Sequence, residues 1–472
     1  MTPEPHEGYA GSYFWRGFLI GANLSPIYAP RAGITGDLKL TPVLEYYGKL
    51  LKESRKGLSK LVLSSSESPR IAVLYSQRSL FGCTGTIGAN EWQNANSGWH
   101  ALLGDLGMDY KFIDKESLET KGVAKEFKVL ILPAAIALSD KEISQIEKFV
   151  KAGGTVIADM VPGIYDEHGA LRAKNGFTAR FGCPLPAVPA LIQTKVVYKG
   201  NSAGVPAVKG DFRTTAGTKS FFHVSVLGRG KFVGINLLLG GYQTVTLGGT
   251  GGETSQTASG AAQFCNAWRA IVKGVLLKAG VKPHQEITDA KGKEEFAESC
   301  WRSNGDNHIL GLLKYDISVP VIDPKTGKML NVKLPVKGHV YDLRKGKYLG
   351  YSDKLKVFLI PANGEFFSVM KEKVTKVTLT APQKIKAGSP VKFSARALTV
   401  SGRSAGKVVY HWEFISPSGK EYDRYTGNIL SDAKGEMQHQ FQSAFNDEKG
   451  KWHLKVTCVN SGTGAAVSVT VE

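Results

Sequence analysis

The pattern of apolar residues along this chain changes near Pro283. From Pro69 up to that point short apolar runs alternate with amphipathic helical segments, whereas beyond it the helical period disappears and only short strand-like runs remain. Alternating strands and helices are typical of a mostly parallel sheet covered by helices on both faces. At 472 residues the chain is also too long for one core. We therefore predict a multidomain protein, α/β first and all-β afterwards.

Five apolar runs within the alternating segment are expected to form the parallel sheet. The capping box from Ser139 to Glu142 begins one covering helix, and Gly153 and Gly154 end it. Further helices are expected at Ser97–Gly107 and Ala261–Ala279. This order predicts a flavodoxin-like, three-layer αβα domain. Its strands are expected at Arg70–Tyr75, Met108–Asp114, Lys128–Pro133, Thr155–Ala158 and Gly230–Leu238.

The first 66 residues are too few in elements to form a domain. The aromatic run from Tyr13 to Ile20 is interpreted as a strand, and Thr41–Leu61 as an amphipathic helix with Pro42 at its first turn. One strand and one helix cannot bury a core alone. We expect this segment to lean on the next domain or to end something larger, and Phe14, Trp15 and Phe18 to be poorly buried.

The C-terminal part of the chain is predicted to form two small antiparallel β domains. Residues 297–370 contain short strand-like runs separated by Gly, Asn and Lys turns. From about Val374 a second series begins, in which apolar and polar residues alternate strictly at Val391–Ala395 and Trp452–Val456. This rhythm is typical of an Ig-like β-sandwich, although Cys458 has no partner for an inter-sheet disulfide.

The net charge of +19 is spread evenly along the chain and is accompanied by no basic run or zinc-finger spacing. This distribution argues against nucleic-acid binding. No apolar run approaches the length of a membrane span, and Glu4 and Glu7 stand where a secretory signal would be basic. We expect no cofactor and no metal site. His100, His308 and His339 have no ligand-spaced partners, and the five cysteines form no C-x-x-C pair.

No catalytic motif is found at the turns where one is expected. The segments that follow the third and fourth strands contain neither G-x-S-x-G nor G-x-C-x-G, and Cys83 is expected to be a structural thiol. The glycine-rich loop Gly248–Gly252 lacks the Lys-Ser/Thr of a P-loop. Glycoside hydrolysis needs two carboxyl groups on one cleft. Carboxylates in or near loops are Glu7, Glu91, Asp140, Asp166 and Glu167, and sequence alone cannot pair them.

Several segments in one order resemble the β-galactosidase trimerisation domain. They are RIAVLYSQ, KVLILPAAIALSDKEISQIEKFVKAGGTVIAD, DEHGALR, GRGKFVGINLLLGGY and LLKAGVKP, spanning about residues 67–290. The resemblance implies a class I glutamine amidotransferase-like fold, found after the catalytic (β/α)8 barrel in one family of β-galactosidases. It also implies a domain that has lost the amidotransferase nucleophile and serves assembly.

The flanking segments are similar to other parts of such enzymes. The run PVKGHVYDLRKGKYLG looks like their small terminal β domain, and YFWRG with TPVLEYYGKLL resembles the last strand and helix of the barrel. The expected domains are therefore 1–66, 67–290, 291–372 and 373–472. Trp15 or Arg16 could line the sugar subsite if the rest of the barrel were present. The catalytic glutamates would lie on earlier strands, so we expect no catalytic residue here.

The resemblance implies a non-catalytic C-terminal portion of a β-galactosidase-like glycoside hydrolase, acting in assembly and in support of the barrel. A complete or split hydrolase subunit acting on galactosides or related glycans, and a carbohydrate-binding or surface-binding module, remain alternatives. A glycan partner would be reached through the parent barrel. We expect a homo-oligomer, with a trimer implied, whose loops Ser76–Asn96 and Val161–Leu171 face a neighbouring copy. An Ig-like end favours an extracytoplasmic location.

Overall fold

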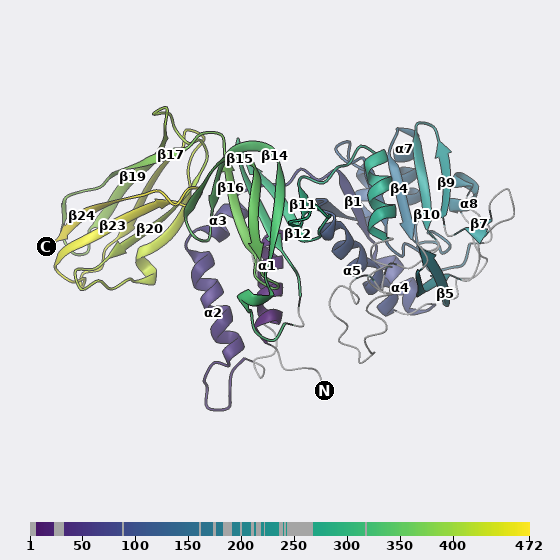
Figure 1. Ribbon diagram of the computed structural model, residues 1–472, viewed down its shortest axis with the longest axis horizontal. Helices are drawn as coiled ribbons and strands as arrows, with labels where there is room; N and C mark the ends of the chain where they lie inside the picture. The colour runs from purple at the N-terminus through teal and green to yellow at the C-terminus, as the bar shows by residue number, and fades with distance from the viewer. Residues whose placement is uncertain are drawn as a thin grey trace. The chain divides into compact units, whose positions relative to one another are not determined.

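The computed structural model divides into two compact units (Figure 1). Residues 68–283 form one unit, here the α/β unit, and residues 1–67 with 284–472 form the other, here the β unit. The chain thus combines an α/β domain with several antiparallel sheets, as the change of pattern predicts. The structure describes residues 6–22, 33–86, 89–159, 162–172, 176–182, 191–198, 201–208, 212–213, 219–220, 222–235, 239, 242, 268–316 and 319–472.

A six-stranded sheet forms the centre of the α/β unit. Its order is β2-β1-β3-β4-β10-β9, and each neighbouring pair is parallel except β10 with β9. The side chains of β3 and β4 are buried along their whole length, which explains why the strands read as continuous apolar runs. The five predicted strands are confirmed, with 236–238 outside the described residues. The bounds are β1 Ile71–Tyr75, β2 Tyr110–Asp114, β3 Val129–Leu132, β4 Thr155–Asp159, β9 Phe222–Leu227 and β10 Gly230–Ile235.

Helices pack on both faces of this sheet. One face packs against the helix that begins at the predicted capping box, through Ile143, Ile146 and Val150. On the other face Trp99 packs edge to face on Trp268, with ring centroids 6.5 Å apart. The helices are α4 Gln77–Thr84, α5 Ala89–Asp105, α6 Lys115–Lys121, α7 Asp140–Lys151, α8 Gly176–Phe181 and residues 268–278. Two short antiparallel pairs also belong to this unit: β5 Leu191–Tyr198 with β6 Asn201–Val208, and β7 Phe212–Arg213 with β8 Lys219–Ser220.

Two predicted loops and the predicted last helix of the α/β unit can be compared with the structure. The expected loop at Ser76–Asn96 is wrong, because α4 and the first eight residues of α5 lie within it. The Ser76 side chain caps α4 by accepting from the Ser79 backbone N–H, and Gly82 and Gly85 had hidden this short helix behind a turn-like composition. The predicted helix at Ala261–Ala279 is confirmed over 268–278, and its earlier residues lie outside the described part of the chain. So does the loop Gly248–Gly252.

The first sheet of the β unit is antiparallel. Its order is β11-β14-β16-β13-β12, with β15 paired to β14. The register between β14 and β15 shifts after Lys333 and is resumed at Gly338. The bounds are β11 Glu286–Thr288, β12 Glu298–Asn304, β13 Asn307–Leu313, β14 Lys328–Asp342, β15 Lys347–Leu359 and β16 Glu365–Met370, and a single 3-10 turn, η2, spans Pro324–Thr326.

Two further sheets, β17-β19-β22 and β18-β24-β23-β20-β21, enclose a common core. The predicted alternation is confirmed, since Val391, Phe393, Trp452 and Leu454 all point into that core. Cys458 is buried there as a free thiol. The bounds are β17 Val374–Thr380, β18 Lys384–Ile385, β19 Pro390–Thr399, β20 Val409–Ile415, η3 Asp423–Tyr425, β21 Thr426–Leu430, β22 Glu436–Gln442, β23 Gly450–Cys458 and β24 Gly464–Val471.

The predicted N-terminal strand is wrong, because Glu7–Leu19 is helix α1. The aromatic run was misinterpreted as a strand because the preceding turns of the helix contain Gly8 and Gly11. Glycine has no side chain, so these positions show no apolar helical pattern. At Gly11 a Cβ would lie 2.4 Å from the Ala362 carbonyl oxygen, so the helix backbone lies directly against the sheet domain. The segment therefore packs within the β unit. One of our two expectations was that it would lean on the domain that follows it in the chain, which is the α/β unit, and this is not the case.

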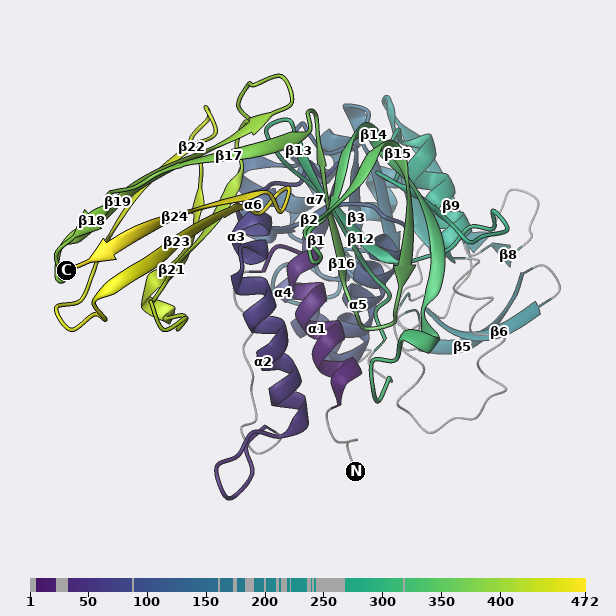
Figure 2. The same ribbon diagram turned by 60° about the vertical axis from the view of Figure 1, so that its left-hand side comes forward.

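Two aromatic side chains of α1, Phe14 and Trp15, are buried, contrary to expectation, and Phe18 is partly buried. Phe14 is 2% exposed and Trp15 is 0% exposed. Figure 2 shows α2 lying alongside α1, and the Phe14 and Tyr47 rings meet at 5.2 Å. The predicted helix at 41–61 is confirmed but is broken by Gly57, whose φ of 110° interrupts it. It comprises α2 Pro42–Arg55 and α3 Leu58–Leu63.

The close approach of α1 predicts an unusual response to Gly11→Ala. Alanine normally stabilises a helix interior relative to glycine by about 0.8–1 kcal/mol. Here the new methyl group would collide with backbone, so we expect the free energy of unfolding to fall by about 1–3 kcal/mol. Gly17→Ala in the same helix is the control. Its new Cβ would have no neighbour closer than 4.0 Å, so this substitution should stabilise the protein. Urea unfolding of both variants measures this, and equal effects would contradict the packing.

Candidate functional site

The carboxyl ends of β1, β3 and β4 form the place where a doubly wound α/β sheet usually carries its site. At the end of β3 the chain turns at Ala134, which has a φ of 39° although it is not glycine. A strained turn at a strand end is the geometry that presents a catalytic nucleophile in other α/β folds. In this chain the turn residue is alanine, which supplies no nucleophilic atom.

The Ala134 turn is held by a buried carboxylate. Asp159, the last residue of β4, is 0% exposed and accepts a hydrogen bond from the Ala134 backbone N–H. Its second oxygen accepts from Trp99 Nε1 on α5, at 2.9 Å. Burial raises the pKa of Asp159 to about 7, and these two hydrogen bonds act in the opposite direction. The carboxylate thus joins β3, β4 and α5 and does not face solvent.

Cys83 lies near this turn but is not placed as a nucleophile. Its side chain is 0% exposed and packs with Trp92, Ile136 and Ile164. Burial raises the pKa of the thiol to about 12, and the charge of Asp159 adds to the effect. Because the thiolate is the reactive form, this cysteine has the character of a structural thiol, as the sequence predicts.

An ion cluster fills the edge beside the turn. Arg78 Nη1 on α4 lies 2.6 Å from Glu119 Oε1 on α6 and 2.9 Å from Glu142 Oε2 on α7. Ser139 Oγ donates to Glu119 Oε1 at 2.6 Å. Glu142 is 0% exposed, and burial raises its pKa although Arg78 and the Ser139 backbone N–H oppose the rise. The capping box was readable in the sequence. The pairing of Arg78 with Glu119 was not, because those residues are 41 positions apart.

The same edge carries exposed apolar side chains. Phe81 on α4 is 72% exposed, Leu171 in the turn after β4 is 50% exposed, and Tyr75 at the end of β1 is 43% exposed. Tyr75 packs edge to face on Trp92, with centroids 5.0 Å apart, so its ring is held in place. The edge is therefore an apolar surface over a closed polar interior.

The two predicted sugar-lining residues lie in the β unit. Trp15 is fully buried, with the Arg344 guanidinium 4.4 Å from its ring, and a Cβ at Gly364 would lie 2.7 Å from it. Arg16 forms an ion pair with Glu298 and stacks 3.2 Å above the Tyr315 ring. Both side chains therefore have structural partners within the β unit. Their role in a sugar subsite stays a prediction.

The candidate carboxylates also have structural partners. Glu7 accepts from the Ile322 backbone N–H at 3.0 Å, and Glu91 lies in the first turn of α5. Asp140 pairs with Arg172 at 2.6 Å, and Glu167 lies 3.8 Å from the same guanidinium. Asp166 accepts from two backbone N–H groups of its own turn, which lowers its pKa. Asp140 and Glu167 therefore share one guanidinium, which gives both carboxylates a structural partner.

Each of the three histidines considered in the sequence as metal ligands contacts a hydroxyl group. His100 contacts Tyr110, His308 Nδ1 lies 2.8 Å from Ser303 Oγ, and His339 Nδ1 lies 2.8 Å from Tyr348 Oη. Over the described residues no group of three or more His, Cys, Asp or Glu could hold a metal ion. Nor does that part of the chain contain a helix long and apolar enough to cross a membrane.

Residues 69–181 match the family model of the beta-galactosidase trimerisation domain. The resemblance seen in the sequence is confirmed. The matched residues contain the Ala134 turn, Asp159 and the Arg78 ion cluster. This match fits a glycoside hydrolase-related role and points to oligomerisation. No curated protein matches the chain.

Solved structures similar to this chain include three glycoside hydrolases. A GH42 beta-galactosidase from G. stearothermophilus is 15% identical, with a TM-score of 0.49, over 71% of this chain and 45% of that one. A beta-galactosidase from Bacillus circulans sp. alkalophilus is 15% identical, with a TM-score of 0.46, over 70% and 45%. An exo-carrageenase GH42 from Bacteroides ovatus is 12% identical, with a TM-score of 0.42, over 78% and 39%. The chain spans less than half the length of these proteins.

The buried carboxylate predicts a pH dependence of stability. In the unfolded chain Asp159 has its usual pKa of 3.8, whereas in the folded protein the pKa is about 7. Between these values only the folded protein keeps the proton, so the free energy of unfolding falls as the pH rises through this window. The contribution is fully present below pH 3.8 and lost above pH 7. The slope for one such group is at most about 1.4 kcal/mol per pH unit.

Asp159→Asn should flatten this profile. The asparagine keeps an acceptor for the Ala134 N–H but cannot accept from Trp99 with its amide nitrogen, so the variant is also less stable at low pH. Urea unfolding followed by tryptophan fluorescence across the window measures the slope. Glu126→Gln, at an exposed position, is the control and should keep the slope of the original chain. Parallel profiles for the original chain and Asp159→Asn would show that Asp159 does not titrate as described.

Proposed function

We propose that this chain is the non-catalytic C-terminal portion of a β-galactosidase-like glycoside hydrolase, and that its α/β unit serves oligomer assembly. The observation that carries the proposal is the Ala134 turn, which has the strained geometry of a nucleophile site but no nucleophile. The polar groups beside this turn, Asp159 and the Arg78 cluster, form hydrogen bonds and ion pairs within the unit. The match of residues 69–181 to the trimerisation domain supports the assembly role.

The topology of the α/β unit supports a finer assignment of its fold. The parallel strands follow the order β2-β1-β3-β4-β10, which is the 2-1-3-4-5 order of flavodoxin-like doubly wound sheets. We assign this unit to the flavodoxin-like and amidotransferase-like group. The two sheets around the core of residues 374–471 support an Ig-like sandwich, because both carry inward residues in alternation along their strands.

The assembly surface is proposed at the carboxyl ends of the strands. Phe81, Leu171 and Tyr75 are exposed there, and apolar aromatic side chains on a polar background are typical of protein interfaces. Closed cyclic symmetry is the usual form of a soluble homo-oligomer, and a trimer needs a heterologous contact repeated three times. The proposed contact thus involves α4 and the turn at 162–171. Both lie within the segments predicted from the sequence to face a neighbouring copy, Ser76–Asn96 and Val161–Leu171.

The N-terminal helices are proposed to support a sugar-hydrolysing barrel. Tyr9 and Tyr13 on α1 are 44% and 47% exposed, and Leu51 on α2 is 38% exposed. These side chains leave an apolar strip on helices whose opposite faces are packed in the β unit. The strip suits a contact with preceding barrel helices, and the glycan substrate would be bound in that barrel.

Sedimentation equilibrium of the full chain tests the assembly proposal. We expect a species of three times the mass of one chain at micromolar concentration. Phe81→Asp should shift it to the mass of one chain, because a carboxylate at the centre of an apolar contact loses its hydration without gaining a partner. Phe445→Asp is the matched control, since Phe445 is 90% exposed but lies in the β unit. It should leave the trimer intact.

Two results of that experiment would contradict the proposal. One is a single-chain species for the unchanged protein. The other is a trimer that survives Phe81→Asp together with Leu171→Asp. Charge reversal at Arg78 is unsuitable as a test, because Arg78 is paired with Glu119 and Glu142 inside the unit and its loss would destabilise the fold itself.

A further inference from the structure

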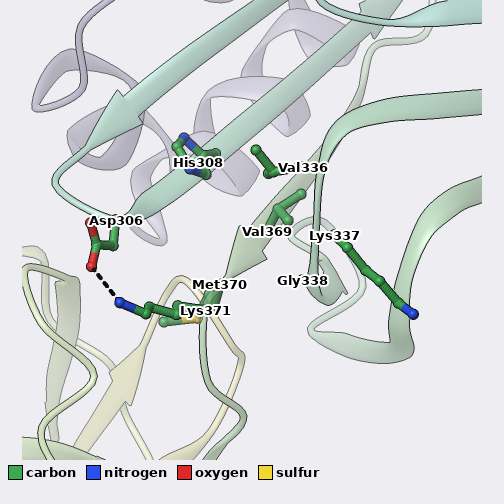
Figure 3. Close-up of a pocket in the computed structure, with 8 residues that line it drawn as sticks. All are labelled: Asp306, His308, Val336, Lys337, Gly338, Val369, Met370 and Lys371. Carbon is green, nitrogen blue, oxygen red and sulfur yellow. Dashed lines mark hydrogen bonds and ion pairs between the residues drawn. The ribbon is translucent and has the colours of Figure 1, made fainter.

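A small cavity opens at one end of the first sheet of the β unit, far in sequence from the trimerisation domain. Its volume is about 210 Å³. At about 30 Å³ per water molecule it holds roughly seven waters, which suits one small ring and not an extended chain. Figure 3 shows its lining, which comes from the β12–β13 hairpin, β14 and the end of β16. Among the lining residues are Asp306, His308, Val336, Gly338, Val369 and Lys371.

The cavity exists because β14 leaves its neighbours at this point. Its register with β15 is interrupted between Lys333 and Gly338, and its pairing with β16 begins only at His339, opposite Met370. Irregular strand segments of this kind are common beside binding sites, where they redirect side chains. Gly338 keeps the irregular segment close to the sheet, since a Cβ there would lie 2.7 Å from Val369 Cγ1.

One wall of the cavity is a flat ring held in a fixed position. The His308 imidazole stacks on the Trp301 indole, with centroids 5.1 Å apart and an interplanar angle of 22°. Its Nδ1 is bonded to Ser303 Oγ at 2.8 Å, which sets the rotation of the ring. Val336 and Val369 lie across the hollow from the histidine (Figure 3). The walls therefore offer one planar surface and apolar methyl groups.

The rim of the cavity is polar but electrically balanced. Asp306 and Lys371 form an ion pair at 3.4 Å, and both side chains are about three-quarters exposed, at 77% and 76%. Lys337 points away from the hollow, and its ammonium lies 5.1 Å from the Tyr351 ring centroid (Figure 3). Burial lowers the pKa of His308, and the charge of Asp306 acts in the opposite direction. The lining is therefore close to neutral although the chain carries +19.

We propose that this cavity binds one neutral, polyhydroxylated six-membered ring, the chemistry of a monosaccharide unit. The C–H face of such a ring packs on His308, and its opposite face lies against Val336. Its hydroxyl groups donate to the Asp306 carboxylate and accept from the Lys371 ammonium, so both charges keep hydrogen bonds when water leaves. An anionic ligand would face Asp306, and a purely apolar one would cover the ion pair without replacing its hydration. The proposed site is independent of the assembly role.

Saturation-transfer difference NMR with the full chain tests the proposal, with D-galactose and D-glucose as probes. We expect transfer to the ring protons of at least one sugar, with a dissociation constant on the order of millimolar. Asp306→Ala and His308→Ala should each raise that constant at least tenfold. Glu472→Ala is the control, because Glu472 forms a comparable exposed ion pair with Lys384 at 2.9 Å and lies elsewhere in the unit. It should leave binding unchanged.

Three outcomes would overturn the proposal. The first is the absence of transfer from either sugar at tens of millimolar in protein whose unfolding transition is normal. The second is transfer that persists in both Asp306→Ala and His308→Ala. The third is tighter binding of D-glucuronate than of D-glucose, which would assign the cavity to anions. Sedimentation of the same samples distinguishes this proposal from the assembly role, because neither substitution touches the α/β unit.

Discussion

The carboxylate of Asp159 is the constraint on which the arrangement of the α/β unit depends. Its two hydrogen bonds join the turn after β3, the end of β4 and helix α5, and its burial makes an unpaired oxygen costly. This holds Ala134 at a positive φ and closes the polar interior of the sheet edge. Exposed apolar side chains above a closed polar interior favour a contact surface. The proposed assembly role follows from that combination.

In the β unit a comparable position is held by Arg344. Its guanidinium bonds the Glu53 carboxylate of α2, the Asn363 side chain at 2.8 Å and the Gly364 carbonyl, and it lies 4.4 Å from the Trp15 ring of α1. One largely buried cation thus joins α1 and α2 to the antiparallel sheet. Helices α1, α2 and α3 belong to the β unit, although they precede the α/β unit in the chain.

The parts of the fold that were readable in the sequence are those set by local pattern. Continuous apolar runs gave β1, β3 and β4, and the Ser139 capping box gave α7. The helix α1 was mistaken for a strand because its close packing depends on glycines that carry no apolar signal. The empty nucleophile turn was also visible, as an alanine after β3. The Arg344 and Arg78 clusters and the cavity at His308 were not predictable, because each joins residues far apart in the sequence.

Electron cryomicroscopy of the full chain tests the assembly account most directly, because it locates the contact as well as counting the copies. The account predicts a particle with threefold symmetry in which Phe81 and Leu171 of each α/β unit are buried against a neighbouring copy. A particle of one chain would contradict it. So would an oligomer in which the carboxyl ends of β1, β3 and β4 remain open to solvent.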